Sequence, residues 1–214
     1  SMDGIMAPLD KIADLADEFD AMIITDECHS SGFLGKTGRG VHEHFGVMDR
    51  VDVITTTLGK GLGGAAGGII AGPREVIEML RNRGRPYLFS NAVPPSIVCG
   101  ALKVIELLTA STERRDQLEA NAKSFRSQME AVGFDLVPGE TPIVPVMLGD
   151  AKLASKMATD LLAEGIYVIG FSFPVVPKGQ ARIRVQLSAA HTEEHIAKAV
   201  KAFTVVGRRL GVVS

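Results

Sequence analysis

The alternation of apolar and polar positions predicts helices and short strands in the first part of the chain. Residues 8–19 have the period of an amphipathic helix, with one apolar face formed by Leu9, Ile12, Leu15, Ala16 and Phe19. Short apolar runs at 21–25, 51–55 and 68–72 predict buried strands. A helix is expected from Pro73 to about Asn82, because proline is tolerated in a first helical turn.

A different pattern begins near residue 95. Two long helical patterns, 95–110 and 113–131, are expected to bridge two lobes, and Gly133 ends the second. The remainder reads as compact α+β, with a helix-capping Thr192 followed by two glutamates. Its expected elements are strands 143–148, 166–169 and 181–187, helices 151–164 and 192–209, and a proline-rich loop at 171–178. The pattern predicts two domains, residues 1–134 and 135–214.

Composition narrows the classes of function. The 214 residues are 46% hydrophobic with net charge −2, so nothing favours binding to nucleic acid or to an anionic membrane. The most apolar stretch, residues 61–72, is too short and too rich in glycine to span a bilayer. Two cysteines, Cys28 and Cys99, form no disulfide framework, and no secretory signal pattern opens the chain. We therefore expect a cytoplasmic protein.

Lys60 carries the strongest chemical signal. It stands among threonines and glycines in the segment 55–64 (TTTLGKGLGG), directly after the apolar run 51–54. Amines form Schiff bases with carbonyls, and pyridoxal phosphate (PLP) is the cofactor that uses this chemistry most. Threonine hydroxyls and glycine amides would suit the phosphate of such a cofactor.

Asp26 supplies a second, matching feature. It follows the apolar run 21–25 and is followed three residues later by His29. A pyridine nitrogen stays protonated when an anion lies against it, and Asp26 can be that anion. Ligands of open α/β sheets gather beyond the carboxyl ends of strands. Asp26 and Lys60 both follow strand-like runs, which predicts one shared PLP site.

Other chemistries fit these residues less well. The glycine spacing around Lys60 matches neither a P-loop nor a dinucleotide-binding loop, and an ordinary solvated lysine is the plain alternative. Cys28 and His29 could form a nucleophile pair, but sequence neighbours rarely face each other correctly. Zinc could be held by Cys28, His42 and His44, although their spacing fits no closed structural site, and no metal is expected.

Two arginines mark the strand expected at 181–187. Strand alternation places Arg182, Arg184 and Gln186 on one face. Two like charges there are costly unless an anion or surface acids balance them, and a guanidinium matches a carboxylate in bidentate fashion. Spacing does not decide which arginine binds a substrate.

Several segments together resemble the α-oxoamine synthases, a PLP-dependent family. They are Ser1 to Gly4, Asp26 to Gly35, Gly38 to Gly40, Thr57 to Gly64, Arg85 to Asn91 and Pro174 to Thr192. The resemblance covers essentially the whole chain and implies an α/β, aminotransferase-like fold of type I. It also implies that the chain matches the C-terminal half of the family, with part of the large PLP-binding domain and a complete small α+β domain.

The resemblance assigns roles to individual residues. Lys60 would form the Schiff base and move the α-proton of the substrate, Asp26 would pair with the pyridine nitrogen, and His29 would hydrogen-bond the ring hydroxyl. Arg184 would bind the substrate carboxylate and leave Arg182 a structural role. The remaining implied cofactor contacts are Ser1 beside the cofactor, Thr57 at the phosphate, and Ser90 with Asn91 at the phosphate of the neighbouring subunit of a homodimer.

Segments 87–91 and 174–191 favour the family members that condense glycine with acetyl-CoA to 2-amino-3-oxobutyrate, an acyltransferase reaction of threonine degradation. One alternative is a sibling synthase that uses another acyl-CoA. The other is a truncated, inactive assembly partner, because a half-fold would leave open sheet edges and an incomplete core.

Overall fold

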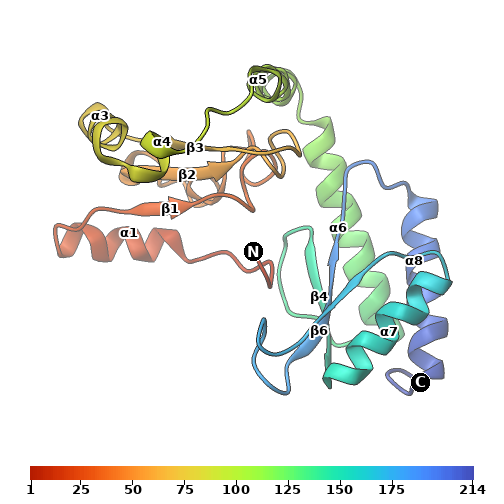
Figure 1. Cartoon of the computed structure of the whole chain (residues 1–214). Helices are drawn as coiled ribbons and strands as arrows, with labels where there is room; N and C mark the ends of the chain where they lie inside the picture. Colours follow the sequence, from red (N-terminus) through yellow and green to blue (C-terminus); the bar gives the residue numbers. More distant parts are fainter. The chain divides into compact units, whose positions relative to one another are not determined.

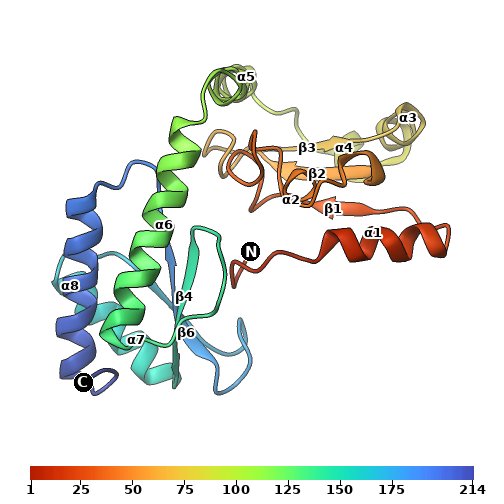
Figure 2. The same cartoon turned by 180° about the vertical axis from the view of Figure 1, so that it is seen from behind.

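The computed structural model describes residues 1–214, which divide into two compact units. We call residues 6–115 the N-terminal unit, and residues 1–5 together with 116–214 the C-terminal unit. Figures 1 and 2 show that each unit has a sheet of its own. Each unit is described separately below.

A three-stranded sheet organises the N-terminal unit. Its order is β1-β2-β3, with β1 (Ile24–Asp26) parallel to β2 (Val53–Thr57) and β3 (Gly68–Ala71) antiparallel to β2. In the register of the parallel pair, Asp26 lies opposite Thr55. The carboxyl ends of β1 and β2 therefore lie at the same edge of the sheet (Figure 1).

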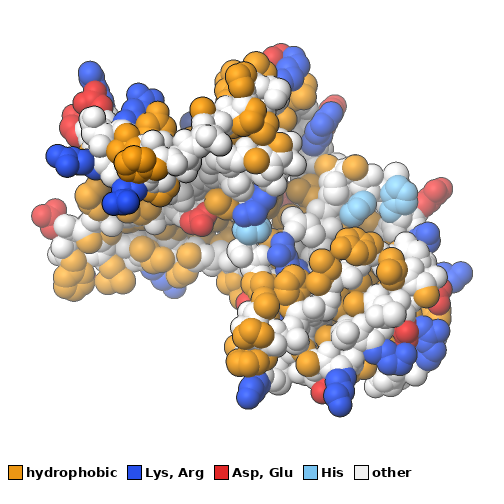
Figure 3. All heavy atoms as spheres, viewed as in Figure 1, with side chains coloured by type: hydrophobic (Ala, Val, Ile, Leu, Met, Phe, Trp, Pro, Cys, Tyr) orange, Lys and Arg blue, Asp and Glu red, His pale blue; other side chains and the backbone are white.

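The helices of this unit cover only part of its apolar surface. They are α1 (Leu9–Glu18), α2 (Val41–His44), a 3-10 turn (Met48–Arg50), α3 (Arg74–Arg83), α4 (Arg85–Phe89) and α5 (Pro95–Ala110). Small clusters form under α1 and around Ala101 of α5. Other large apolar side chains stay exposed, including Leu15, Phe19 and Ile24. Figure 3 shows apolar side chains gathered along the α1 side of this unit.

The C-terminal unit contains an antiparallel sheet in the order β4-β6-β5. Its strands are β4 (Ile143–Gly149), β5 (Ile169–Phe171) and β6 (Ala181–Gln186). β6 lies in the middle, paired with β4 from Ile143 onward and with β5 from Ile169 onward. The backbone of β6 is therefore hydrogen-bonded to a strand on each side.

Three helices complete the C-terminal unit and its core. They are α6 (Glu113–Val132, in this unit from Asp116), α7 (Ala151–Ala163) and α8 (Glu193–Arg209). Phe203 of α8 packs edge to face against Phe125 of α6 and against Phe134. These rings belong to a large cluster of buried residues that also includes Met157 and Ile183. This core is much larger than either cluster of the N-terminal unit.

The observed elements follow the expected order with some shifted bounds. Strand 21–25 was expected where β1 begins at residue 24, and strand 166–169 was expected where β5 begins at residue 169. α4 and the 3-10 turn were not expected. The units divide after Arg115, whereas the sequence placed the boundary after residue 134. The reason is α6, which contributes Phe125 and Met129 to the core of the C-terminal unit.

No helix of the chain, taken singly, has both the length and the apolar character needed to cross a bilayer. Only α5 and α6 counted together, with a bend between them, satisfy that criterion.

Candidate cofactor and substrate site

Asp26 is the last residue of β1 and turns its carboxylate into the loop that follows. Its Oδ1 accepts a hydrogen bond from the amide of Cys28 at 2.9 Å. Hydrogen bonds from Cys28 lower the pKa of Asp26, and charge interactions with Lys60 and His29 lower it further. Asp26 is therefore an anion throughout the neutral range of pH.

Lys60 lies at the tip of a tight loop between β2 and β3. The carbonyl of Lys60 accepts hydrogen bonds from the amides of Gly63 and Gly64. At the base of the loop, the Thr57 hydroxyl donates to the carbonyl of Gly67 at 3.1 Å and accepts from the amide of Gly59 at 3.1 Å. The loop is thus closed by its own backbone, which leaves the Lys60 side chain exposed.

Asp26, His29 and Lys60 come together at one edge of the N-terminal sheet. Asp26 and His29 follow β1 and Lys60 follows the parallel strand β2, and charge interactions with Lys60 and His29 lower the pKa of Asp26. Their donor set fits PLP, since it offers an exposed amine, an anion and an imidazole within one unit. Ser90 and Asn91 also belong to this unit, in the exposed segment between α4 and α5.

The two arginines of β6 have different environments. Arg182 is only 4% exposed, forms an ion pair with Asp3, and donates to the main-chain and side-chain oxygens of Gln180. Arg184 instead donates to the side chain of Gln186 at 2.7 Å, while its buried Nε has no hydrogen-bond partner. Arg182 is therefore fully engaged within the protein, whereas Arg184 retains donor capacity.

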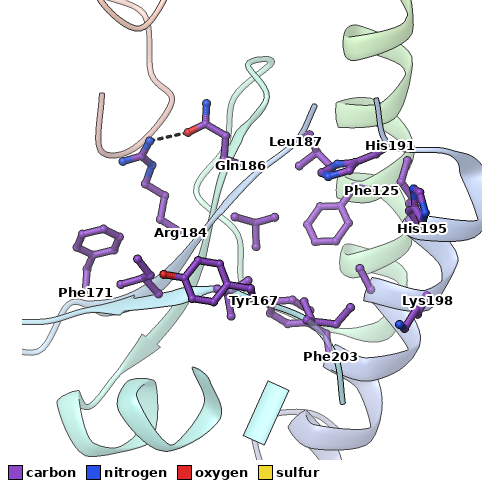
Figure 4. A pocket seen from close by; sticks show the side chains of 17 residues that line it. Phe125, Tyr167, Phe171, Arg184, Gln186, Leu187, His191, His195, Lys198 and Phe203 are labelled. Carbon is purple, nitrogen blue, oxygen red and sulfur yellow. Dashed lines mark hydrogen bonds between the residues drawn. The ribbon is translucent and has the colours of Figure 1, made fainter. Parts of the chain in front are cut away.

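Arg184 lies beside a cavity of about 650 Å³ in the C-terminal unit, a size common for small-molecule sites. Figure 4 shows Arg184 and Gln186 joined on one side of this cavity, with His191, His195 and Lys198 on the other. Burial lowers the pKa of Arg184. The lining contains cationic side chains and no carboxylate, which suits a carboxylate ligand. Ser1 also belongs to this unit.

The nucleophile and zinc interpretations gain no support from the geometry. Burial raises the pKa of the Cys28 thiol, and its hydrogen bond to Asp26 raises it further, so the thiolate is disfavoured at neutral pH. The described chain, residues 1–214, contains no group of three side chains arranged to hold a metal ion. His42, considered as a zinc ligand, instead contacts the carboxylate of Glu27 at 2.8 Å.

Two acidic residues that contact the site regions, Glu27 and Asp3, were not predicted from the sequence. Strand alternation carries a signal for Glu27, because successive side chains point to opposite faces and a glutamate after Asp26 would point inward. Glu27 is indeed 1% exposed. Nothing local marked Asp3, whose partner Arg182 is 179 residues away in sequence.

Comparison with known proteins defines the family. Residues 1–203 match the family model described as aminotransferase class I and II. The chain belongs to this family. Its structure is similar to a high-resolution structure of SPT with its PLP internal aldimine, with a TM-score of 0.95 and 35% identity over 100% of this chain and 54% of the other. The expected α/β fold of PLP-dependent transferases is confirmed, for the C-terminal part of that fold.

Several curated relatives share one name, whereas another, 46% identical over 213 residues, is an 8-amino-7-oxononanoate synthase of Thermosipho melanesiensis. The chain is 57% identical over 214 residues to a 2-amino-3-ketobutyrate coenzyme A ligase of Escherichia coli (strain K12). It is 55% identical over 213 residues to a mitochondrial 2-amino-3-ketobutyrate coenzyme A ligase of Homo sapiens. The match covers 100% of this chain in both cases, but 54% and 51% of the relatives. The chain spans about half the length of these relatives.

Proposed function

We propose that this chain provides the PLP-binding lysine and the substrate-binding arginine of a glycine C-acetyltransferase, which condenses glycine with acetyl-CoA to 2-amino-3-oxobutyrate and CoA. One observation carries the proposal. Asp26, His29 and Lys60 gather at the carboxyl edge of β1 and β2, in a chain 57% identical to a 2-amino-3-ketobutyrate CoA ligase. The same activity would serve glycine metabolism and threonine breakdown.

Each residue of the N-terminal unit has a role in this proposal. With PLP bound, Asp26 would pair with the ring nitrogen and His29 would hydrogen-bond the ring hydroxyl. Lys60 would bind the aldehyde and, once the amine of glycine has replaced it there, its free amine would accept the α-proton of glycine. Thr57 would donate its hydroxyl to the phosphate in place of the hydrogen bond that it now donates to the carbonyl of Gly67. When bound, PLP supplies the electron sink that stabilises a carbanion, so the protein contributes orientation and charge.

The C-terminal unit provides the substrate carboxylate site. Arg184 has an unpartnered Nε and lies beside a cavity without acidic lining, so its guanidinium is suited to hold the carboxylate of glycine. Arg182 is held by Asp3 and Gln180, which suits a structural role. We propose that Ser1 also contacts the cofactor.

We further propose a homodimer in which Ser90 and Asn91 reach the cofactor phosphate of the partner. Their exposure between α4 and α5 supports this role. Mixing a Lys60→Ala chain with a Ser90→Ala/Asn91→Ala chain tests it, because hybrid dimers would regain one intact site. Mixtures no more active than either variant would contradict a shared site. The free cysteines favour a reducing compartment, and we propose the cytoplasm.

Absorbance and product analysis test the main proposal. PLP bound to a lysine absorbs near roughly 420 nm, so the chain mixed with PLP should gain this band and the Lys60→Ala variant should not. Glycine with acetyl-CoA should give 2-amino-3-oxobutyrate faster than glycine with longer acyl-CoAs. A preference for a longer acyl-CoA would instead identify a sibling synthase.

A second candidate function is that of an assembly partner without activity. The exposed apolar side chains of α1 and β1, such as Leu15 at 55% and Ile24 at 67%, favour it. Such surfaces mark places where other polypeptide packs. A protein that folds but stays colourless with PLP would support this second function.

A further inference from the structure

A buried carboxylate follows Asp26 directly in sequence and points to the opposite side. Glu27 is 1% exposed, and its Oε2 accepts hydrogen bonds from the amide of Val41 at 2.9 Å and from the Ser30 hydroxyl. Its Oε1 accepts from the amide of His42 at 3.3 Å and lies 2.8 Å from Nδ1 of the same residue. Both carboxylate oxygens are therefore held, as a buried charge requires.

The main-chain amide and carbonyl of Glu27 are also hydrogen-bonded. Its amide donates to the carbonyl of Thr55 in β2 at 2.7 Å. Its carbonyl accepts from the amides of Ser30 at 3.1 Å and Ser31 at 2.9 Å. Glu27 thus ties the turn after β1 to β2 on one side and to α2 on the other. Because Asp26 shares a peptide plane with it, fixing Glu27 limits the directions in which Asp26 can point.

Gly40 makes room for this carboxylate. Its φ of 124° belongs to a region that side-chain-bearing residues rarely adopt. A Cβ on Gly40 would lie 2.4 Å from Oε2 of Glu27. The segment before α2 is therefore shaped to receive Glu27.

We propose that Glu27 and His42 form a positioning pair, which holds the turn 26–29 so that Asp26 and His29 face the Lys60 loop. Neither member touches the cofactor in this account, so neither is a catalytic residue. The proposal rests on the proposed PLP function, and it adds a determinant of cofactor affinity on the far side of the turn. Outer partners of this kind orient the groups that bind directly.

The test compares two glutamates of the same unit. Glu27→Gln places an amide donor among the donors of α2, whereas Glu43→Gln is the matched control. Glu43 accepts from the amides of Thr37 and Arg39, both at 3.0 Å, so its hydrogen bonds go to the segment 37–39 and not to the turn 26–29. Two quantities are measured on the 214-residue chain. They are the hydrogen-exchange rates of single amides without PLP, and the dissociation constant for PLP.

Glu27→Gln should speed exchange at the amides of Cys28, Ser30 and Ser31 relative to the other amides of the unit, and Glu43→Gln should not change this ratio. The dissociation constant for PLP should rise roughly 10-fold or more, as for other outer partners of binding groups. The pH midpoint of the absorbance near roughly 420 nm should also move, because Asp26 and His29 would be displaced from the cofactor.

His42 provides a second, gentler pair of variants in case Glu27→Gln does not fold. An asparagine amide can place an N–H where Nδ1 of His42 lies, but leucine cannot. His42→Leu should therefore reproduce the effects on exchange and affinity, and His42→Asn should largely restore the unchanged values.

Exchange rates at Cys28, Ser30 and Ser31 that match the control in every folded variant would overturn the positioning pair. So would unchanged PLP affinity in His42→Leu. Failure of the proposed function would look different. The chain without substitutions would then bind no PLP, although Glu27→Gln still speeds exchange at these amides. The exchange data and the PLP data thus separate the two failures.

Discussion

Replacing Gly40 by alanine should lower the free energy of unfolding more than the addition of one methyl group suggests, because it disturbs the hydrogen bonds of the Glu27 carboxylate. Alanine at position 40 would have to adopt a φ of 124°. Its Cβ would lie 2.4 Å from Oε2 of Glu27, well inside contact distance. The carboxylate would have to move, and its hydrogen bond from the amide of Val41 would be lost or lengthened.

The cost follows from two contributions. A side chain in this backbone region costs on the order of 1–3 kcal/mol. A lost hydrogen bond to a charged group costs about 1.5–3 kcal/mol. Together these give about 2.5–6 kcal/mol for Gly40→Ala. Gly46 is the matched control, because its φ is 70° and nothing lies within 4 Å of an added Cβ. Gly46→Ala should cost only the backbone contribution, about 1–2 kcal/mol.

Urea unfolding followed by circular dichroism measures both costs. With a denaturant slope of about 2 kcal/mol per molar, Gly40→Ala should lower the midpoint by roughly 1 M or more. Gly46→Ala should shift it by less than about 1 M. Equal shifts for the two variants would show that the carboxylate of Glu27 moves away from the added Cβ without any loss of stability, contrary to this prediction.

Three further predictions concern charge and reactivity. Partial burial acts to raise the pKa of Glu43, but hydrogen bonds from residues 37–39 outweigh it, so the pKa is lowered. Its stabilisation is present above the ordinary carboxyl pKa and is lost as pH falls, so Glu43→Gln should lower Tm at about pH 7 and not at about pH 3. Cys28, whose pKa is raised by burial, should react with iodoacetamide at neutral pH more slowly than the exposed Cys99, and a difference that persists in urea would contradict this. Arg184→Lys should raise KM for glycine and leave the affinity for PLP unchanged, and an equal loss of both would contradict a carboxylate-binding role.

The sequence predicted the elements that depend on local pattern. Helices at 95–110 and 113–131 were placed almost to the residue, because the period of both and the proline start of the first are local signals. β5 was misplaced, because the apolar residues 166–168 suggested a strand. The amide of Ile166 instead bonds back to Leu161 at the end of α7, and the strand starts later.

Contacts between residues far apart in the sequence could not be predicted from local patterns. The loop sequence placed Asp26 and Lys60 at one sheet edge, but the contact between Glu27 and His42 joins residues 15 positions apart through the fold. The choice between Arg182 and Arg184 likewise depends on Asp3 at the far end of the chain. Apolar periodicity identifies elements and their faces, whereas pairing of charges depends on how the elements come together.

Covalent trapping of PLP shows whether Lys60 is the lysine that binds the cofactor. The chain is incubated with PLP, reduced with borohydride, digested and analysed by mass spectrometry. We expect a PLP adduct concentrated on Lys60, absent from the Lys60→Ala variant and weak on the exposed Lys36 of the neighbouring loop. An adduct spread over surface lysines, or unchanged in amount by Lys60→Ala, would contradict it.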